Sequence, residues 1–226
     1  MIKEIAVYAS PIALAISFFV ETSSWWIRTS ASKENIGLYI SRSNIYLYGG
    51  RFFALIFSVL FALQIESGAT TAEIALLFSI SFMCSFIIQT LFLNRKFRIF
   101  IIMNLSILLF LPHVSSNESQ KYAAPLVEQR NIFIATLVAT SLFSIGISIP
   151  LFVASIFFDN RLALSNLGQL INSFGMIVLL FFVDQKIYSA FDGGYLSRVV
   201  YIYSTARAAA FFLVSALYVA IYAALP

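Results

Sequence analysis

Two arginines lie inside stretches of sequence that are otherwise apolar enough to cross a membrane. Arg51 stands near the middle of residues 36–63, and Arg207 stands well inside residues 196–225. An arginine at the centre of a membrane helix costs about 2.5–3.5 kcal/mol on insertion scales. Its planar guanidinium presents N–H donors that match the oxygens of a carboxylate or a phosphate in pairs. The two arginines therefore predict a site for anions inside the membrane.

Two stripes of polar side chains accompany the arginines at helical spacing. The first stripe shares a helical face with Arg51, and the second lies on a later expected helix. The stripes comprise Ser41 and Asn44, and Ser165, Gln169 and Asn172. Polar residues at such spacing either join neighbouring helices by hydrogen bonds or line a polar cavity within the membrane.

Two acidic residues lie close enough to the membrane interior to act on these arginines. Glu21 lies just inside the end of the first apolar stretch, and Asp184 directly follows residues 162–183. In one interpretation a carboxylate pairs with an arginine and locks two helices together, which is a purely structural role. The deep basic residues outnumber the deep acids, however. This surplus favours a polar, cationic cleft between two halves of the chain that takes an external anion.

The composition excludes most classes of soluble protein. Of the 226 residues, 61% are hydrophobic and 11% are charged, and the mean hydropathy is +0.92. An average soluble domain is about 45–50% apolar and about 25% charged. A soluble enzyme, a nucleic-acid-binding domain and a disordered chain are therefore excluded. We predict an all-α polytopic membrane protein that has no nucleic acid as a partner.

The residues that usually carry catalysis or bind metals are scarce. Cys84 is the only cysteine and His113 the only histidine, so a metal site built from cysteine or histidine pairs is not expected. The sequence also lacks the glycine-rich pattern of a P-loop, which would bind ATP. We therefore expect no cofactor, no metal site and no enzymatic activity.

Six stretches are long and apolar enough to span a bilayer as helices. They are residues 5–26, 36–63, 71–93, 131–158, 162–183 and 196–225. Residues 99–114 are shorter, so we expect a re-entrant or interfacial helix, and residues 115–130 read as a polar loop. Trp25 and Trp26 are placed like aromatic anchors at the membrane surface.

The distribution of basic residues supports this topology. If residues 99–114 remain on one side of the membrane, only Lys3 and Arg161 lie on the other side. The first side then holds nine basic residues: Arg28, Lys33, Arg95, Lys96, Arg98, Lys121, Arg130, Lys186 and Arg198. Because basic residues concentrate in cytoplasmic loops, this side is assigned to the cytoplasm and both termini to the outside.

The predicted topology divides one membrane domain into two halves. Residues 1–98 form an N-terminal half of three helices, and residues 131–226 form a C-terminal half of three helices. Residues 99–130 join the halves as the short segment and polar loop. Since the two halves run in opposite senses, an inverted repeat is one interpretation of the layout, and such repeats are common in transporters.

Several short motifs occur together in an order that resembles one known family. Glu21-Thr22 is followed by Arg28, and Ser41, Asn44-Ile45 and Arg51 follow in the second apolar stretch. Further matches lie in the second half: Leu164-Ser165, Ile171-Asn172, Phe182-Val183-Asp184 and Arg207. Taken together, these residues resemble the Amj (alternate to MurJ) family, the small lipid II flippases of bacterial cytoplasmic membranes.

The resemblance implies a multi-pass protein of the bacterial cytoplasmic membrane that moves a lipid-linked peptidoglycan precursor across the bilayer. Arg51 and Arg207, with Arg28 at the cytoplasmic mouth, would hold the diphosphate. The polar stripes, Ser165 included, would replace water around the sugars. Glu21 and Asp184 would release the arginines when substrate leaves, or carry a proton. The partners implied are this precursor and the membrane lipids.

Two other functions fit the same residues. A secondary transporter for a small solute or an ion would use the same cationic cleft. A non-transporting membrane scaffold or assembly protein would use the polar residues only to join helices.

Overall fold

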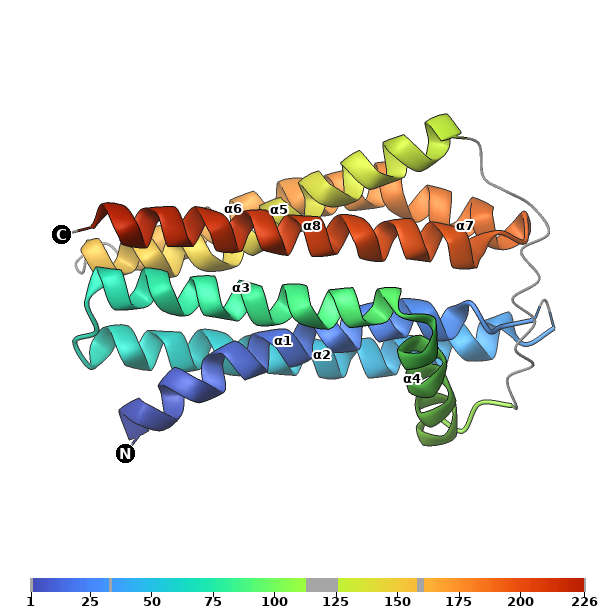
Figure 1. Cartoon of the computed structure of the whole chain (residues 1–226), viewed down its shortest axis with the longest axis horizontal. Coiled ribbons are helices and arrows are strands. Elements are labelled where there is room, and N and C mark those ends of the chain that lie inside the picture. Colours follow the sequence, from blue (N-terminus) through green and yellow to red (C-terminus); the bar gives the residue numbers. More distant parts are fainter. Residues whose placement is uncertain (1, 33, 113–125, 158–160, 226) are drawn as a thin grey trace.

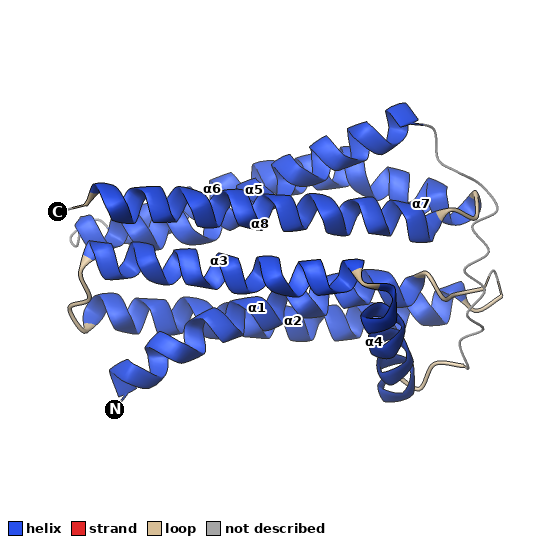
Figure 2. Cartoon of the chain, viewed as in Figure 1, coloured by secondary structure: helices blue, strands red, loops and turns tan. Residues whose placement is uncertain are grey.

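The computed structural model describes residues 2–32, 34–112, 126–157 and 161–225, and these residues form helices joined by short turns, with no strand among them (Figure 2). The helices are α1 (Ile2–Arg28), α2 (Ile36–Glu66), α3 (Thr71–Leu93), α4 (Arg95–Leu108), α5 (Leu126–Ile156), α6 (Arg161–Val178), the π-helical segment η2 (Leu179–Asp184), α7 (Gln185–Asp192) and α8 (Leu196–Ala224). The predicted all-α fold is confirmed.

The long helices lie side by side in one bundle, and both ends of the chain lie at the same end of it (Figure 1). Six helices in the described part of the chain are long and apolar enough to span a membrane. The α6, η2 and α7 segments follow one another without a break and supply one of these spans. The prediction of six spans with both termini on one side is confirmed.

The short helix α4 lies at the opposite end of the bundle and runs across the direction of the long helices (Figure 1). Its 14 residues correspond to about 21 Å, which is less than the roughly 30 Å of a bilayer core. The side chain of Asn94 caps its first turn by accepting hydrogen bonds from the backbone N–H groups of Lys96 and Phe97. This cap starts the helix at Arg95, four residues earlier than the apolar run beginning at Ile99 suggested.

Two other predicted boundaries are wrong. We expected a helix to end at Val183 with Asp184 closing it, but the chain stays helical to Asp192. No proline or glycine interrupts this stretch before Gly193, and Gly194 then adopts a positive φ of 75°, which ends the helix. Helix α5 begins at Leu126, inside the range expected as a loop, while residues 115–125 lie outside the described part of the chain.

The packing of the helices follows the same scheme in both halves. Helix α1 packs on α2, as α5 packs on α6, and the third helices of the halves, α3 and α8, pack on each other. Helix α1 also contacts α3, as α5 contacts α8. Because equivalent helices run in opposite directions along the bundle, this is the arrangement found in inverted repeats.

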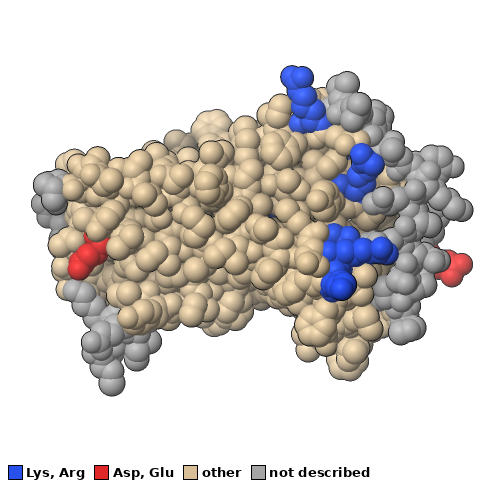
Figure 3. All heavy atoms as spheres, viewed as in Figure 1, with Lys and Arg blue, Asp and Glu red and all other residues tan. Residues whose placement is uncertain are grey.

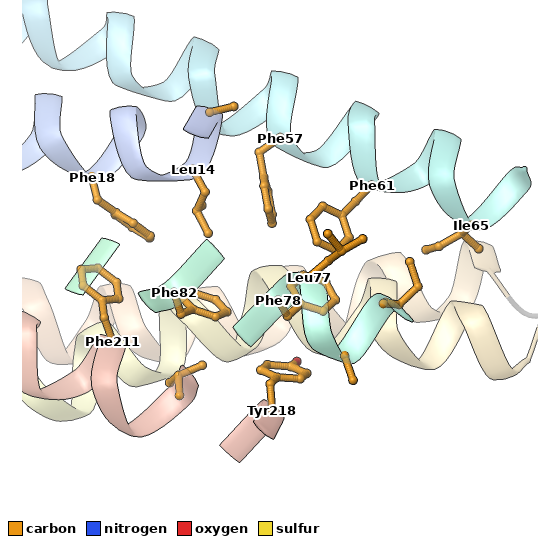
Figure 4. Close-up of a cluster of buried hydrophobic side chains, with 14 residues drawn as sticks. Leu14, Phe18, Phe57, Phe61, Ile65, Leu77, Phe78, Phe82, Phe211 and Tyr218 are labelled. Carbon is orange, nitrogen blue, oxygen red and sulfur yellow. The ribbon is translucent and has the colours of Figure 1, made fainter. Parts of the chain in front are cut away.

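An aromatic cluster fills the bundle towards the end that holds the termini (Figure 4). Phe57 and Phe61 of α2 meet Phe78 of α3, and the rings of Phe61 and Phe78 stack with centroids 4.2 Å apart. Phe18 of α1 meets Phe211 of α8 at a centroid distance of 4.3 Å. The cluster therefore joins both halves through apolar contacts alone.

Basic residues gather at the α4 end of the bundle, whereas acidic residues are visible at both ends (Figure 3). The described basic residues at the α4 end are Arg28, Arg95, Lys96, Arg98, Arg130, Lys186 and Arg198, while Lys33 and Lys121 lie outside the described part of the chain. By the positive-inside rule, we expect the α4 end to face the cytoplasm.

The topology predicts which residues a membrane-impermeant reagent reaches in intact cells. In a Cys84→Ser background, a cysteine at Ser67, in the turn between α2 and α3, should react with an impermeant maleimide added outside. A cysteine at Lys96 should react only after the membrane is permeabilised. Both positions are exposed in the structure, so a lack of reaction reports sidedness rather than burial. The reverse labelling pattern would contradict the assigned orientation.

Candidate functional site

The centre of the site is an ion pair that joins the two halves of the protein. The two terminal guanidinium nitrogens of Arg207 in α8, Nη1 and Nη2, contact the carboxylate of Glu21 in α1, and Nη2 lies 2.8 Å from Oε2. The hydroxyl of Tyr203 accepts a hydrogen bond from Arg207 Nη1 at 2.6 Å. The same hydroxyl donates to Glu21 Oε1 at 3.3 Å. Tyr203 thus completes a hydrogen-bonded network of three side chains.

The surroundings of this pair are largely apolar. The rings of Phe18 and Phe211 lie 5.4 and 5.6 Å from the guanidinium of Arg207. The Arg207 side chain is 3% exposed, whereas that of Glu21 is 32% exposed. Arg207 is therefore bound by a carboxylate of the protein, as in the structural interpretation of the sequence. The one side of the network that remains accessible is the carboxylate side.

Arg51 has a different environment, although it lies beside the same carboxylate. Its side chain is exposed, and its guanidinium lies 5.3 Å from the ring of Tyr48, one turn earlier in α2. Glu21 is within electrostatic range of Arg51, but Arg51 forms no ion pair with any described residue. Arg51 is thus a deep cation whose N–H donors remain available to an anion.

A close contact between α1 and α2 sets the position of Arg51. A Cβ atom on Gly50 would lie 3.0 Å from Val20 Cγ1 and 3.1 Å from the carbonyl oxygen of Ser17. Only glycine allows the two backbones to approach so closely. Since α1 and α2 run antiparallel, this contact brings Arg51 to the level of Glu21 along the bundle.

Arg28 lies nearer the cytoplasmic end of the same helix pair. Its Nε donates to Ser43 Oγ at 2.7 Å, and its Nη2 donates to Asn44 Oδ1 at 2.7 Å. The ring of Trp25 lies 4.2 Å from the guanidinium, in the geometry of a cation–π contact. Arg28 is 6% exposed, so these contacts hold it inside the protein rather than in a surface loop.

Asp184 brings the C-terminal half close to this group. It ends the π-helical segment η2, where the wider turn changes the direction of the side chains that follow. Asp184 is within electrostatic range of Arg28, Glu21 and Tyr203. Its Oδ1 atom is buried and accepts no hydrogen bond from the described residues.

The second polar stripe does not join the arginines. The amide of Asn172 points at α5, where a Cβ atom on Gly146 would collide with it, and its Oδ1 is buried without a hydrogen-bond partner among the described residues. Gln169 is exposed on α6, and the side chain of Ser165 lies outside what the structure describes. In the first stripe, Asn44 contacts Arg28, whereas Ser41 is exposed.

The prediction that Trp25 and Trp26 are anchors at the membrane surface is wrong. The two residues are only 9% and 1% exposed. Trp26 donates through Nε1 to Ser204 of α8 at 3.0 Å, and Arg98 of α4 lies 4.2 Å above its ring. Inside the bundle, each of the two tryptophan rings thus makes a cation–π contact with an arginine.

The hydrogen bond of Tyr203 to Arg207 was not predicted from the sequence, which suggested an anchor at the membrane surface or a sugar contact, although a usable signal was present. It lies one helical turn before Arg207, on the same face of α8, so its hydroxyl can reach the same partner. A phenol one turn from a deep arginine is a candidate hydrogen-bond partner in any membrane helix, since the lipid offers none.

Comparison with protein-family models, with curated proteins and with solved structures finds no match to this chain. The described residues also contain no group of three histidine, cysteine, aspartate or glutamate side chains placed to hold a metal ion. The groups at the site that can bind a ligand are its arginines, carboxylates and amides.

The ion pair predicts a strong energetic coupling between α1 and α8. Replacing Arg207 with Met leaves the Glu21 carboxylate without its partner, and we expect the free energy of unfolding to fall by about 3 kcal/mol. Adding Glu21→Gln removes the unpaired charge and should recover most of this loss. Unfolding by SDS in mixed micelles, followed by circular dichroism, measures both effects. Losses that simply add in the double variant would show that the two residues are not coupled.

Proposed function

We propose that this protein is a flippase that moves an undecaprenyl-diphosphate-linked peptidoglycan precursor, lipid II, across the bacterial cytoplasmic membrane. The observation that carries the proposal is the exposed guanidinium of Arg51 in the middle of a membrane span, with no ion-pair partner in the described residues. The resemblance of the motifs around Glu21, Arg51, Asp184 and Arg207 to a flippase family supports the same substrate.

The substrate requires a cation within the membrane for a simple physical reason. The undecaprenyl tail can stay in the lipid, while the diphosphate carries charge that the bilayer core rejects. The guanidinium of Arg51 can bind phosphate oxygens with two parallel N–H donors. Exposed amides such as Asn44 can replace water around the polar head group.

The ion pair between Glu21 and Arg207 gives the cycle a resting arrangement without substrate. It joins α1 of one half to α8 of the other, so relative movement of the halves has to strain or break it. A diphosphate on Arg51 also lies near the Glu21 carboxylate, and like charges repel. Binding of the anion therefore favours release of Glu21 from its present position, and the halves then rock around the site, as in other inverted-repeat transporters.

A scaffold is the second candidate, and one observation favours it. Arg207 is clamped by a carboxylate in apolar surroundings, as expected for a pair that only joins helices. A scaffold explains Arg207 but leaves Arg51 without a role. An exposed arginine in mid-span raises the free energy of membrane insertion without joining any helix. The two candidates therefore differ most clearly at Arg51.

The decisive variant is Arg51→Ala. The exposed side chain contacts only the Tyr48 ring on its own helix and joins no other helix among the described residues, so the variant should insert and accumulate like the wild type. We expect transfer of a fluorescent lipid II analogue in proteoliposomes to fall at least tenfold, because the diphosphate loses its cation in the membrane core. In cells depleted of their main lipid II flippase, the wild-type chain should restore growth and surface-exposed lipid II, and Arg51→Ala should not.

Arg42→Ala provides the matched control. Arg42 lies on the same helix but closer to its cytoplasmic end. Its replacement removes the same charge from the protein but leaves Arg51 in place in the membrane core. It should transfer the analogue at close to the wild-type rate. Wild-type rates from Arg51→Ala would contradict the proposed mechanism and leave the scaffold as the better explanation.

A further inference from the structure

Arg28 is a buried arginine whose hydrogen bonds all go to neutral groups. Its two hydrogen-bond partners on α2, the Ser43 hydroxyl and the Asn44 carbonyl oxygen, carry no charge. Within the described residues, Nη1 of Arg28 donates no hydrogen bond, and Tyr188, Tyr203 and the carboxylate of Asp184 act on it only over electrostatic range. A buried charge with neutral partners is only partly compensated. This distinguishes Arg28 from Arg207, whose charge is matched by Glu21.

The orientation of Asn44 adds donors beside this guanidinium. Arginine can only donate, so the atom of Asn44 that faces Arg28 must be the oxygen. The amide nitrogen of Asn44 then points away from Arg28 with its N–H groups available, and Asn44 is exposed. An anion that approaches Asn44 would meet its amide N–H groups together with the positive charge of Arg28.

The positions of these residues along the helices define two levels. Arg28 and Asn44 form an inner level near the cytoplasmic end, and Glu21 and Arg51 form a middle level. In both helices the two levels are seven residues apart, which corresponds to about 10 Å of helix rise. The hydrogen bond between Ser23 and Tyr46, at 3.2 Å, lies between the levels and keeps α1 and α2 in this register.

We propose that Arg28 and Asn44 form a first binding site that takes the diphosphate of the lipid-linked substrate from the cytoplasmic leaflet before it reaches Arg51. This rests on the flippase proposed above and adds an order of events to it. The anion binds first to Asn44 and Arg28, where Trp25 fixes the guanidinium. It then moves about two helical turns along α2 to Arg51, where it faces the Glu21–Arg207 pair.

A charge introduced at position 44 tests this site without disturbing the fold. Asn44→Asp keeps the shape of the side chain and places a carboxylate against Arg28, so the protein supplies its own anion. We expect the affinity of the detergent-solubilised protein for undecaprenyl diphosphate to fall at least tenfold, with thermal stability equal to or above that of the wild type. Asn104→Asp, an equivalent change at an exposed position of α4, should leave the affinity unchanged.

The probes separate the lipid-linked diphosphate from its parts. Undecaprenol, which lacks the phosphates, should bind equally to the wild type and to Asn44→Asp. Inorganic diphosphate should compete only weakly, and competition as strong as that of the lipid would show a site for free anions instead. In the transfer assay, Asn44→Asp should raise the KM for substrate on the cytoplasmic face, whereas Arg51→Ala should lower kcat.

The outcomes also separate this inference from the function on which it rests. If Asn44→Asp binds undecaprenyl diphosphate as tightly as the wild type does, while Arg51→Ala still abolishes transfer, the first site is wrong and the flippase stands. If the wild-type protein binds no undecaprenyl diphosphate and transfers no lipid II, both proposals are wrong.

Discussion

The ion pair between Glu21 and Arg207 is the interaction on which the rest of the polar structure depends. The buried charge of Arg207 needs a partner inside the protein, and the bidentate contact with Glu21, completed by Tyr203, supplies it. Because Glu21 belongs to α1 and Arg207 to α8, satisfying this charge also fixes how the two halves meet. The neighbouring residues Trp25 and Trp26 then pack against α8 through Tyr203 and Ser204.

Charge is divided unevenly between the two halves, although their helices pack by the same scheme. The N-terminal half contributes Arg28, Arg51 and the exposed amide of Asn44, which are all suited to an anion. The C-terminal half contributes Arg207, already neutralised, and Asp184, which would repel an anion. An inverted repeat of helices thus carries a site built mainly on one pair, α1 and α2. The α5–α6 pair uses its glycines, Gly146 and Gly168, for close packing instead.

The six spans could be predicted because each depends on the length and hydrophobicity of one segment. The expected sidedness depends only on counting basic residues at the ends of those segments. What the sequence could not provide is the rotation of each helix about its own axis, which is decided by its neighbours. Asn172 has the spacing of a cavity-lining residue, yet it faces Gly146. Trp25 and Trp26 have the position of surface anchors, yet both are buried.

The aromatic cluster between the ion pair and the outer end of the bundle has an electrical consequence. A tightly packed layer of phenylalanine side chains has a low dielectric constant, and the exposed polar groups around Arg51 and Asn44 lie on its cytoplasmic side. An apolar layer of this kind raises the electrostatic cost of any charge that moves past it towards the outer end of the bundle. A full crossing is worth about 2.3 kcal/mol per charge at 100 mV. Under the proposed flippase function, and with the α4 end at the negative interior of the cell, the transmembrane field pushes an anion bound at Arg51 outward, towards this apolar layer.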